Sequence, residues 1–298
     1  LKNPCRFRRN FWLASRHRMI RDAVMNDSLP QLFRSEPPWL IGVVHLLPLP
    51  GSPRWAGDLQ AIWKRAVDDA NAYRRGGAHA LVIENFGDLP FTKGSVPPET
   101  IAAMAQAAAA IRRAVSLPIG FNVLRNDVRA GLGLCSACDG QFVRVNVHTG
   151  AMLTDQGVIE GKAFETLRGR AALCPKTKIF ADVQVKHAVP LAPQPIGQSA
   201  RDTLERGLAD AMIVSGTGTG LATDLADVRA VREACPAACI LIGSGIAAQN
   251  IGHYLPYADG FIVGSSLKHG GAVDRAVDAR RVAELRRAMT RPPARKPK

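Results

Sequence analysis

The sequence lacks any long uninterrupted apolar run. Its longest candidate, residues 102–111, contains Gln106 and is followed at once by Arg112 and Arg113. A membrane-spanning helix needs about 20 consecutive apolar residues, so this pattern excludes a transmembrane protein. The first residues also lack an apolar segment with a small-residue cleavage site, and we therefore expect no secretory signal.

Cysteine is sparse as well, with 6 in 298 residues, and no second pair completes a zinc-ligand set. We therefore expect reduced thiols and a cytoplasmic protein. Cys135 and Cys138 have the spacing of a redox pair, but no thioredoxin-like pattern precedes them. Two small residues on a buried helix face are the favoured interpretation. With 47% hydrophobic and 21% charged residues, the chain is neither disordered nor fibrous.

Acidic residues are too few to balance the basic ones, since 39 Lys and Arg against 25 Asp and Glu give a net charge of +14. Such a charge suggests a polyanionic partner, but its distribution indicates otherwise. Residues 1–40 carry 8 basic and 3 acidic side chains and residues 274–298 carry 9 and 3, which leaves +3 for the residues between them. The ends lack interleaved aromatic residues and any recognised nucleic-acid module, so no specific nucleic-acid partner is expected.

This distribution divides the chain into three parts. We expect residues 1–36 to be a short, basic, weakly structured extension, or sequence upstream of the true start. Residues 37–289 are expected to form a single domain, and residues 290–298 a tail of Pro, Arg and Lys. Peripheral contact of the basic termini with a membrane is one expectation for them.

From Trp39 onward, short β-branched runs alternate with longer helical patterns. Strands that alternate with helices indicate βαβ units and a parallel sheet, and eight units in about 250 residues predict a (β/α)8 TIM barrel. A doubly wound sheet would place a Gly-rich fingerprint after its first strand, whereas here Gly clusters follow the last three. The expected strands are Leu40–His45, Ala80–Glu84, Ile119–Val123, Phe142–Val147, Ile179–Val185, Ala211–Ser215, Ile240–Gly243 and Gly260–Val263. Among the expected helices are Leu59–Arg74, Pro98–Val115, Gly161–Leu173, Arg201–Gly207, Asp224–Ala234, Ala247–Tyr254 and Val277–Met289.

Polar side chains recur where these strands end, which is the catalytic face of a TIM barrel. The candidate catalytic residues are Glu84, Asp182, Lys186 and His45. Buried charges are costly unless paired, so we expect mutual neutralisation around a shared cavity among Glu84, Arg144, Asp182 and Lys186. For any one of them alone, a structural ion pair is an equal alternative, and His45 alone is equally a core histidine. Lys186 could form a Schiff base, but a permanent cation that neutralises Asp182 or a phosphate is favoured.

Two further sets of residues complete the expected site. Asn122, Arg144, Asn146 and Asp88 are the candidate substrate-binding residues, and Gly218, Gly245, Gly264 and Ser265 the candidate phosphate-binding residues. Glycines allow backbone N–H groups to approach an anion, a helix starting in Ser265–Leu267 would add its dipole, and Lys268 could add a charge or be merely solvated. Purely steric roles for these glycines are the alternative. No fixed metal-ligand spacing is present, although Glu84, Asp88, Asp127 and Asp182 have the oxygen ligands that suit Mg²⁺.

Several segments in a fixed order carry a resemblance to a known family. They are Gly42-Val-Val-His-Leu-Leu-Pro-Leu-Pro-Gly51, Glu84-Asn-Phe-Gly-Asp88, Phe121-Asn-Val-Leu-Arg-Asn-Asp127, Phe142-Val-Arg-Val-Asn-Val147, Thr154-Asp-Gln-Gly157, Ala181-Asp-Val-Gln-Val-Lys-His187, Asp210–Gly220, Gly243-Ser-Gly245 and Ala258–Lys268. Together they resemble the BtpA/SgcQ family, from about Trp39 to Arg287. The resemblance implies a TIM barrel. For the cyanobacterial member that named the family it also implies a role in photosystem I biogenesis, and thus photosynthesis. Other members are described as candidate enzymes, and no catalytic mechanism comes with the family.

Two functions follow as hypotheses. The first is an enzyme, a lyase, isomerase or hydrolase, that binds a small phosphorylated metabolite such as a sugar or nucleoside phosphate. The second is a non-catalytic photosystem I biogenesis or stability factor, peripheral to the membrane, because one barrel scaffold serves both uses. A homo-oligomer is compatible with either.

Overall fold

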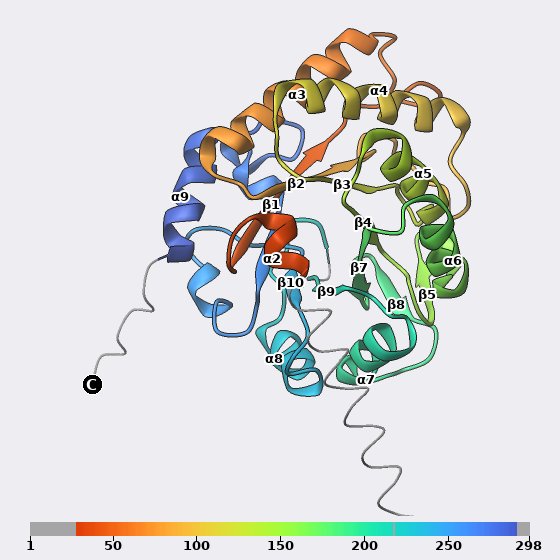
Figure 1. The fold of residues 1–298 in the computed structure, drawn as a ribbon, viewed down its shortest axis with the longest axis vertical. Coiled ribbons are helices and arrows are strands. Elements are labelled where there is room, and N and C mark those ends of the chain that lie inside the picture. The colour runs from red at the N-terminus through yellow and green to blue at the C-terminus, as the bar shows by residue number, and fades with distance from the viewer. Residues whose placement is uncertain (1–27, 217, 291–298) are drawn as a thin grey trace, which may run out of the picture.

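The computed structural model describes residues 28–216 and 218–290 of the chain. Eight parallel strands within these residues close into a barrel, in the order β1-β11-β10-β9-β7-β4-β3-β2 around it (Figure 1). The closed parallel barrel confirms the predicted fold. Its strands are β1 (Trp39–His45), β2 (Ala80–Glu84), β3 (Ile119–Asn122), β4 (Phe142–Val145), β7 (Lys178–Val183), β9 (Ala211–Val214), β10 (Ile240–Ile242) and β11 (Gly260–Val263).

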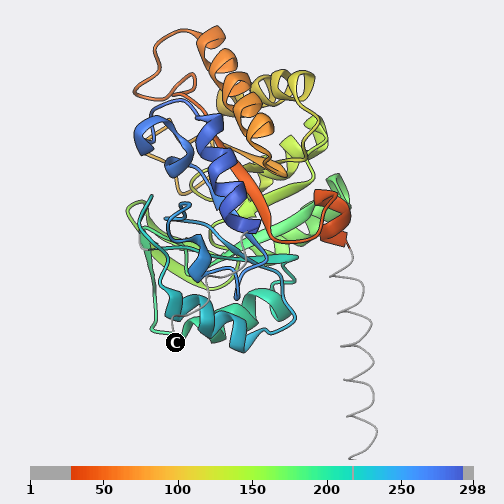
Figure 2. The same ribbon diagram turned by 90° about the vertical axis from the view of Figure 1, so that its left-hand side faces the viewer.

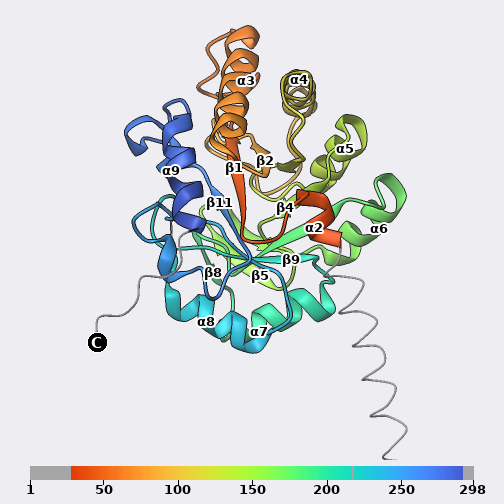
Figure 3. The ribbon, with the colours of Figure 1, turned by 60° about the vertical axis from the view of Figure 1, so that its left-hand side comes forward.

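Helices surround this barrel on its outer side (Figure 3). Asp58 begins the first of them, because its carboxylate accepts a hydrogen bond from the Ala61 amide at 3.0 Å. No helix in the described part of the chain is long and apolar enough to cross a membrane. The outer helices are α3 (Leu59–Gly76), α4 (Pro98–Ala114), α5 (Val128–Cys138), α6 (Ala163–Leu173), α7 (Ile196–Arg201) with a π-helical continuation (Asp202–Arg206), α8 (Leu225–Ala234) and α9 (Ala279–Thr290).

The barrel strands are buried on both faces, and their side chains alternate between two clusters. In β1, Leu40 and Val44 pack outward with the helices, whereas Ile41 and Val43 pack inside the barrel. This alternation is the two-residue period of an extended chain. It places the last residue of β1, His45, on the inner face.

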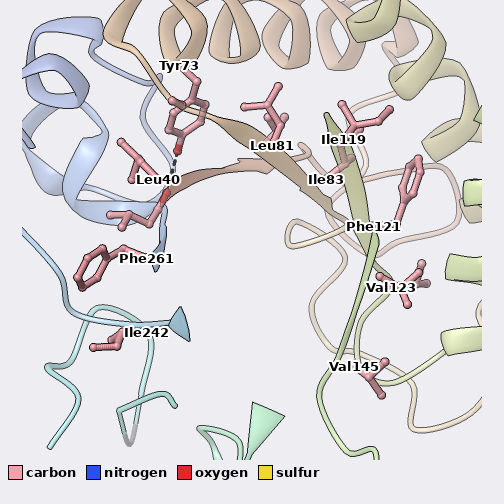
Figure 4. Packing of buried hydrophobic residues seen from close by; sticks show 14 of the residues in the cluster. Leu40, Tyr73, Leu81, Ile83, Ile119, Phe121, Val123, Val145, Ile242 and Phe261 are labelled. Carbon is pink, nitrogen blue, oxygen red and sulfur yellow. Dashed lines mark hydrogen bonds between the residues drawn. The ribbon is translucent and has the colours of Figure 1, made fainter. Parts of the chain in front are cut away.

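The outer cluster joins helices to strands (Figure 4). Tyr73 of α3 is fully buried, and its hydroxyl donates to the carbonyl oxygens of Val43 at 3.0 Å and Val263 at 3.3 Å. Those carbonyls belong to β1 and β11, so one side chain ties the first strand to the last. A buried hydroxyl needs such partners, because burial without them costs several kcal/mol.

A short helix, α2 (Ser28–Phe33), covers one end of the barrel (Figures 1 and 2). Leu29 and Phe33 are buried with the inner cluster, and the Phe33 ring lies 4.7 Å from that of Trp39 and 6.3 Å from that of Phe180. The expected weakly structured extension through residue 36 is therefore wrong for residues 28–33. They form a plug because their apolar residues complete the barrel interior. Residues 1–27 of the expected extension and 291–298 of the expected tail lie outside the described residues.

Two further elements differ from expectation. The predicted helix Ala247–Tyr254 is only a turn with a 3₁₀ segment, Ile251–His253. The Asn250 side chain accepts from the Ala247 amide at 2.9 Å and donates to the Gly245 carbonyl at 2.8 Å, which satisfies the backbone without a helix. A small antiparallel sheet was not predicted, and it consists of β5 (Ala151–Thr154), β6 (Gly157–Glu160) and β8 (Ala188–Pro190).

Candidate functional site at the barrel mouth

Polar side chains form a layer inside the barrel at the C-terminal ends of its strands. His45 of β1 lies beside Glu84 of β2, and Glu84 lies beside Asn122 of β3, as paired residues of neighbouring strands. Arg144 of β4 and Asp182 of β7 follow inward-facing Phe142 and Phe180 by two residues, so they point inward as well. The structure thus gathers most of the candidate catalytic and binding residues, and the neighbouring Phe142 and Phe180 rings stack beneath them at 4.7 Å.

Arg144 lies at the centre of this layer, where its guanidinium contacts two carboxylates. Its guanidinium donates from Nε to Asp182 Oδ2 at 2.8 Å and from Nη2 to Asp182 Oδ1 at 3.0 Å, while Nη1 lies 3.4 Å from Glu84 Oε1. Burial alone would lower the pKa of Arg144, but the two carboxylates outweigh burial and raise it. Arg144 is therefore a permanent cation, and Asp182 is its counter-ion rather than that of Lys186.

In the described part of the chain, one oxygen of Glu84 takes part in no hydrogen bond. Its Oε1 accepts from Asn122 Nδ2 at 2.9 Å and from Arg144, whereas its Oε2 lies 3.7 Å from His45 Nε2. Burial, followed by the charges of Lys268, Lys186 and Arg144, holds the pKa of His45 well below its usual value. Near neutral pH the imidazole of His45 is therefore neutral, and it can donate a hydrogen bond from one ring nitrogen and accept one at the other.

Lys186 follows β7 at the rim of the barrel and is half-buried. Burial, and then the charge of Arg144, lowers the pKa of its amine to about 8. The expected ion pair between Lys186 and Asp182 does not form, because Arg144 occupies both oxygens of Asp182.

A first cavity, about 280 Å³, opens between the last two barrel loops and the charged layer, and we term it the glycine-loop cavity. Three of the four residues predicted to bind phosphate line it, namely Gly245, Gly264 and Ser265. Their neighbours Gly243, Ser244 and Ser266 line it too, as do His45, Glu84, Arg144, Lys186 and Arg281.

Two glycines of this cavity have no room for a side chain. Gly245 has a φ of +64°, and a Cβ there would lie 2.3 Å from the Ala222 Cα; at Gly264 it would lie 2.8 Å from Cε1 of His45. Glycine is therefore required at both positions for steric reasons. Because glycine has no side chain, the backbone at both positions is also exposed to the cavity. The segment Ser265–Leu267 is a 3₁₀ turn of three residues, too short for the expected helix dipole.

A second cavity, about 530 Å³, lies on the other side of Glu84, Arg144 and Lys186, and we term it the aromatic-walled cavity. Asn122 and Asn146, predicted as substrate-binding residues, line it. Two of its lining residues have buried polar atoms without a hydrogen-bond partner, Asn146 Oδ1 and Arg125 Nε. The remaining walls are Phe86, Leu89, Phe91, Leu124, Asp155, His187 and Thr219.

Four predicted residues lie apart from these cavities, and one of them is the candidate catalytic residue Asp182, whose side chain is 0% exposed beside Arg144. Asp88 lines neither of them, and its carboxylate accepts from the Leu49 amide at 2.8 Å, which joins the loops after β1 and β2. Gly218 lines neither, and its carbonyl accepts from Ser244 Oγ at 2.9 Å. Lys268 is neither solvated nor at the cavity wall, since it is 1% exposed and lies 4.0 Å from Asp69.

The four carboxylates considered for Mg²⁺ do not come together. In residues 28–216 and 218–290 no group of three or more His, Cys, Asp or Glu is placed to hold a metal ion. Asp127 Oδ1 accepts from the Ala130 amide at 3.0 Å as the cap of α5, and its Oδ2 accepts from the Val96 amide at 2.9 Å. Both carboxylate oxygens of Asp127 thus accept hydrogen bonds from backbone amides, which the sequence alone does not predict.

Sequence reasoning missed some of the lining residues. Arg125 and Phe86 closely follow predicted strands, so their position near the barrel mouth could be predicted. That they line the aromatic-walled cavity could not. Arg281 comes from α9, and its Nε donates to the Ser266 carbonyl at 2.8 Å. No local pattern indicates this, because α9 returns to the first cavity only through the closure of the barrel.

A model of the BtpA family matches residues 36–291. The photosystem I biogenesis protein BtpA of Synechocystis sp. is 45% identical over 259 residues, which cover 87% of this chain and 90% of that protein. An uncharacterized protein of Pyrococcus abyssi is 42% identical over 250 residues, with coverage of 84% and 95%. The putative sgc region protein SgcQ of Escherichia coli is 32% identical over 249 residues, with coverage of 83% and 92%.

Solved structures show likeness in fold. A chain of tryptophan synthase from Mycobacterium tuberculosis superposes with a TM-score of 0.59 and 16% identity, covering 90% of this chain and 98% of its own. Phosphoribosyl anthranilate isomerase from Thermus thermophilus gives a TM-score of 0.53 and 14% identity, with coverage of 85% and 98%. At such low identity these likenesses bear on the fold alone.

Proposed function

The chain belongs to the BtpA family, and we propose that it is an enzyme that binds a small phosphorylated metabolite, a sugar or nucleoside phosphate, at the barrel mouth. The observation that carries this proposal is the glycine-loop cavity, in which the bare backbone of Gly245 and Gly264 faces the same space as His45, Glu84 and Lys186. The loops after the last two strands are the usual phosphate site of this fold.

Phosphate recognition in this proposal rests on backbone amides, the Ser265 hydroxyl and a cation. Arg281 lines the cavity, and the hydrogen bond from its Nε to the Ser266 carbonyl orients the guanidinium. An arginine so held offers charge-assisted hydrogen bonds to an anion.

Proton transfer is the chemistry that the charged layer supports best. Glu84 offers its free Oε2, and the neutral His45 lies beside it at 3.7 Å. Asn122 and Arg144 hold the other oxygen of Glu84, which orients the carboxylate. Isomerases and lyases need such a positioned acid or base, and a hydrolase would use it to activate water.

The test compares two adjacent arginines in a ligand-binding assay. Arg281→Gln removes one of the cations that line the cavity. Arg280→Gln is the matched control, because Arg280 is exposed and pairs with Asp278. We expect inorganic phosphate and a panel of sugar and nucleoside phosphates to raise the melting temperature of the wild type. Arg281→Gln should weaken phosphate binding about tenfold, since a hydrogen bond to a charged group is worth about 1.5 kcal/mol or more. No thermal shift with any of these compounds would count against the proposal.

A non-catalytic role is the second candidate, favoured by the 45% identity to the Synechocystis protein named for photosystem I biogenesis. In that case the function depends on the protein surface and the termini, and it does not depend on the charged layer. The discriminating variants are the triple alanine variant of Glu84, Asp182 and Lys186, checked for folding, and a deletion of residues 1–27 that spares α2. If the triple variant keeps the cellular phenotype while the deletion abolishes it, the enzyme proposal is wrong.

A further inference from the structure

Lys186 occupies the wall that the two cavities share. It lines the glycine-loop cavity and the aromatic-walled cavity, as Glu84 and Arg144 also do. A ligand with its phosphate in the first cavity and its remaining atoms in the second would pass directly beside this side chain. The atoms of such a ligand at the boundary would be the ones within reach of the Lys186 amine.

Among the residues that the structure describes, the amine of Lys186 has no partner that would hold it as a structural cation. Within residues 28–216 and 218–290, no carboxylate lies within 4.0 Å of its Nζ, and it makes no hydrogen bond. Asp182 and Oε1 of Glu84 are taken by Arg144. A lysine that served only to neutralise a buried carboxylate would be paired with it.

The main chain of Lys186 is fixed from both sides. Its amide donates to Ser215 Oγ at 3.2 Å, and its carbonyl accepts from Arg125 Nη2 at 2.6 Å. Because both neighbours come from other βα units, the base of the side chain is anchored at the barrel rim. An anchored base with an unpaired amine is the arrangement that an oriented nucleophile requires.

We propose that Lys186 is a nucleophile that forms an imine with the carbonyl carbon of a phosphorylated aldehyde or ketone. This inference rests on the proposed function, because the glycine-loop cavity must take the phosphate. The nitrogen lone pair adds to the carbonyl carbon, and the oxygen then leaves as water with two hydrogens from the amine. No oxidant or reductant is consumed. Glu84 lines the same two cavities as Lys186 and would carry the protons.

The surroundings support this step. Burial and the neighbouring Arg144 lower the pKa of the Lys186 amine to about 8, so roughly a tenth of it is neutral at pH 7. Phe86, Phe91 and Leu124 line the second cavity and limit the access of water to an imine there.

Lys268 is the internal control that the chain itself offers. Burial also lowers the pKa of its amine to about 8, but it lies 4.0 Å from Asp69 and lines neither cavity. If amine basicity alone decided reactivity, both lysines would react alike.

The experiment traps the imine by reduction. The full chain is incubated near pH 8 with glyceraldehyde 3-phosphate or pyridoxal 5′-phosphate and sodium cyanoborohydride, and the modified lysines are identified by peptide mass spectrometry. We expect the adduct on Lys186 to exceed that on Lys268 at least about tenfold, and to fall by a similar factor with the unphosphorylated aldehydes. Lys186→Arg keeps the positive charge and should keep the thermal shift with inorganic phosphate while losing the adduct.

The outcomes separate this inference from the proposed function. If phosphate stabilises the protein but Lys186 is labelled no more than Lys268, the imine is wrong and the phosphate site stands. If Lys186 is labelled equally by phosphorylated and unphosphorylated aldehydes and phosphate gives no shift, the proposed function fails, and with it the substrate class inferred here.

Discussion

Replacing Asp182 with alanine should destabilise the protein strongly, because it leaves a buried guanidinium without its main partner. Asp182 is fully buried and accepts from Arg144 at 2.8 and 3.0 Å and from Asn146 at 3.3 Å. After the change, Arg144 keeps only the 3.4 Å contact with Glu84. Removing one partner of a buried ion pair costs about 3–5 kcal/mol. At about 2–4 °C per kcal/mol, the melting temperature should fall by about 10 °C.

The measurement is chemical denaturation of Asp182→Ala and wild type, with Asp68→Ala as control. Asp68 pairs with Lys64 at 2.6 Å, but both side chains are more than half exposed. Such a pair is worth about 0.5 kcal/mol, so the control should stay close to wild type. Asp182→Leu combined with Arg144→Met should recover part of the loss, because it removes the unpaired guanidinium, while Glu84 loses its 3.4 Å contact with Arg144. A cost of about 1 kcal/mol or less for Asp182→Ala would refute this reasoning.

Three other predictions concern residues around the mouth and the base of the barrel. Gly245→Ala should lower both stability and phosphate binding in thermal-shift titrations, because a Cβ would lie 2.3 Å from Ala222 Cα at a φ of +64°; unchanged titrations would contradict this. Asp127→Ala should cost about 1–3 kcal/mol in urea denaturation, since it leaves the buried Val96 amide unpaired; a neutral result would mean that another acceptor replaces the carboxylate. Burial lowers the pKa of His79 to about 4, so the folded state binds fewer protons than the unfolded state between about pH 4 and 6.5. Stability should therefore be complete above pH 6.5 and decline toward pH 4, with less decline in His79→Gln; an NMR titration with a midpoint near 6.5 would contradict this.

The barrel itself was predictable from local patterns, because each strand is a short apolar run and each helix repeats its apolar residues every three to four positions. The exceptions have identifiable causes. Residues 28–33 look like part of a polar, basic segment, and only the open end of a finished barrel gives Leu29 and Phe33 a place to be buried. At Ala247–Tyr254, the apolar spacing suggests a helix, but the Asn250 side chain stabilises a turn instead.

The candidate site was predictable in part for the same reason. A two-residue period and the end of each strand suffice to place His45, Glu84 and Arg144 in one inward layer. Neither rule says that Asp88 accepts from a backbone amide or that Arg281 reaches the first cavity from α9. These contacts depend on which groups meet once the barrel has closed.

By itself, the sequence determined the alternation of strands and helices, the family, and which polar residues end each strand. These are properties of neighbouring residues, expressed by the geometry of the extended chain and the helix. The tertiary structure alone decided how a few buried charges share their partners. Arg144 binds both oxygens of Asp182 with Nε and Nη2 of its planar guanidinium. Among the residues that the structure describes, Lys186 is consequently left without an ion-pair partner between two cavities. That competition takes place among strands far apart in the chain, so no local pattern records its result.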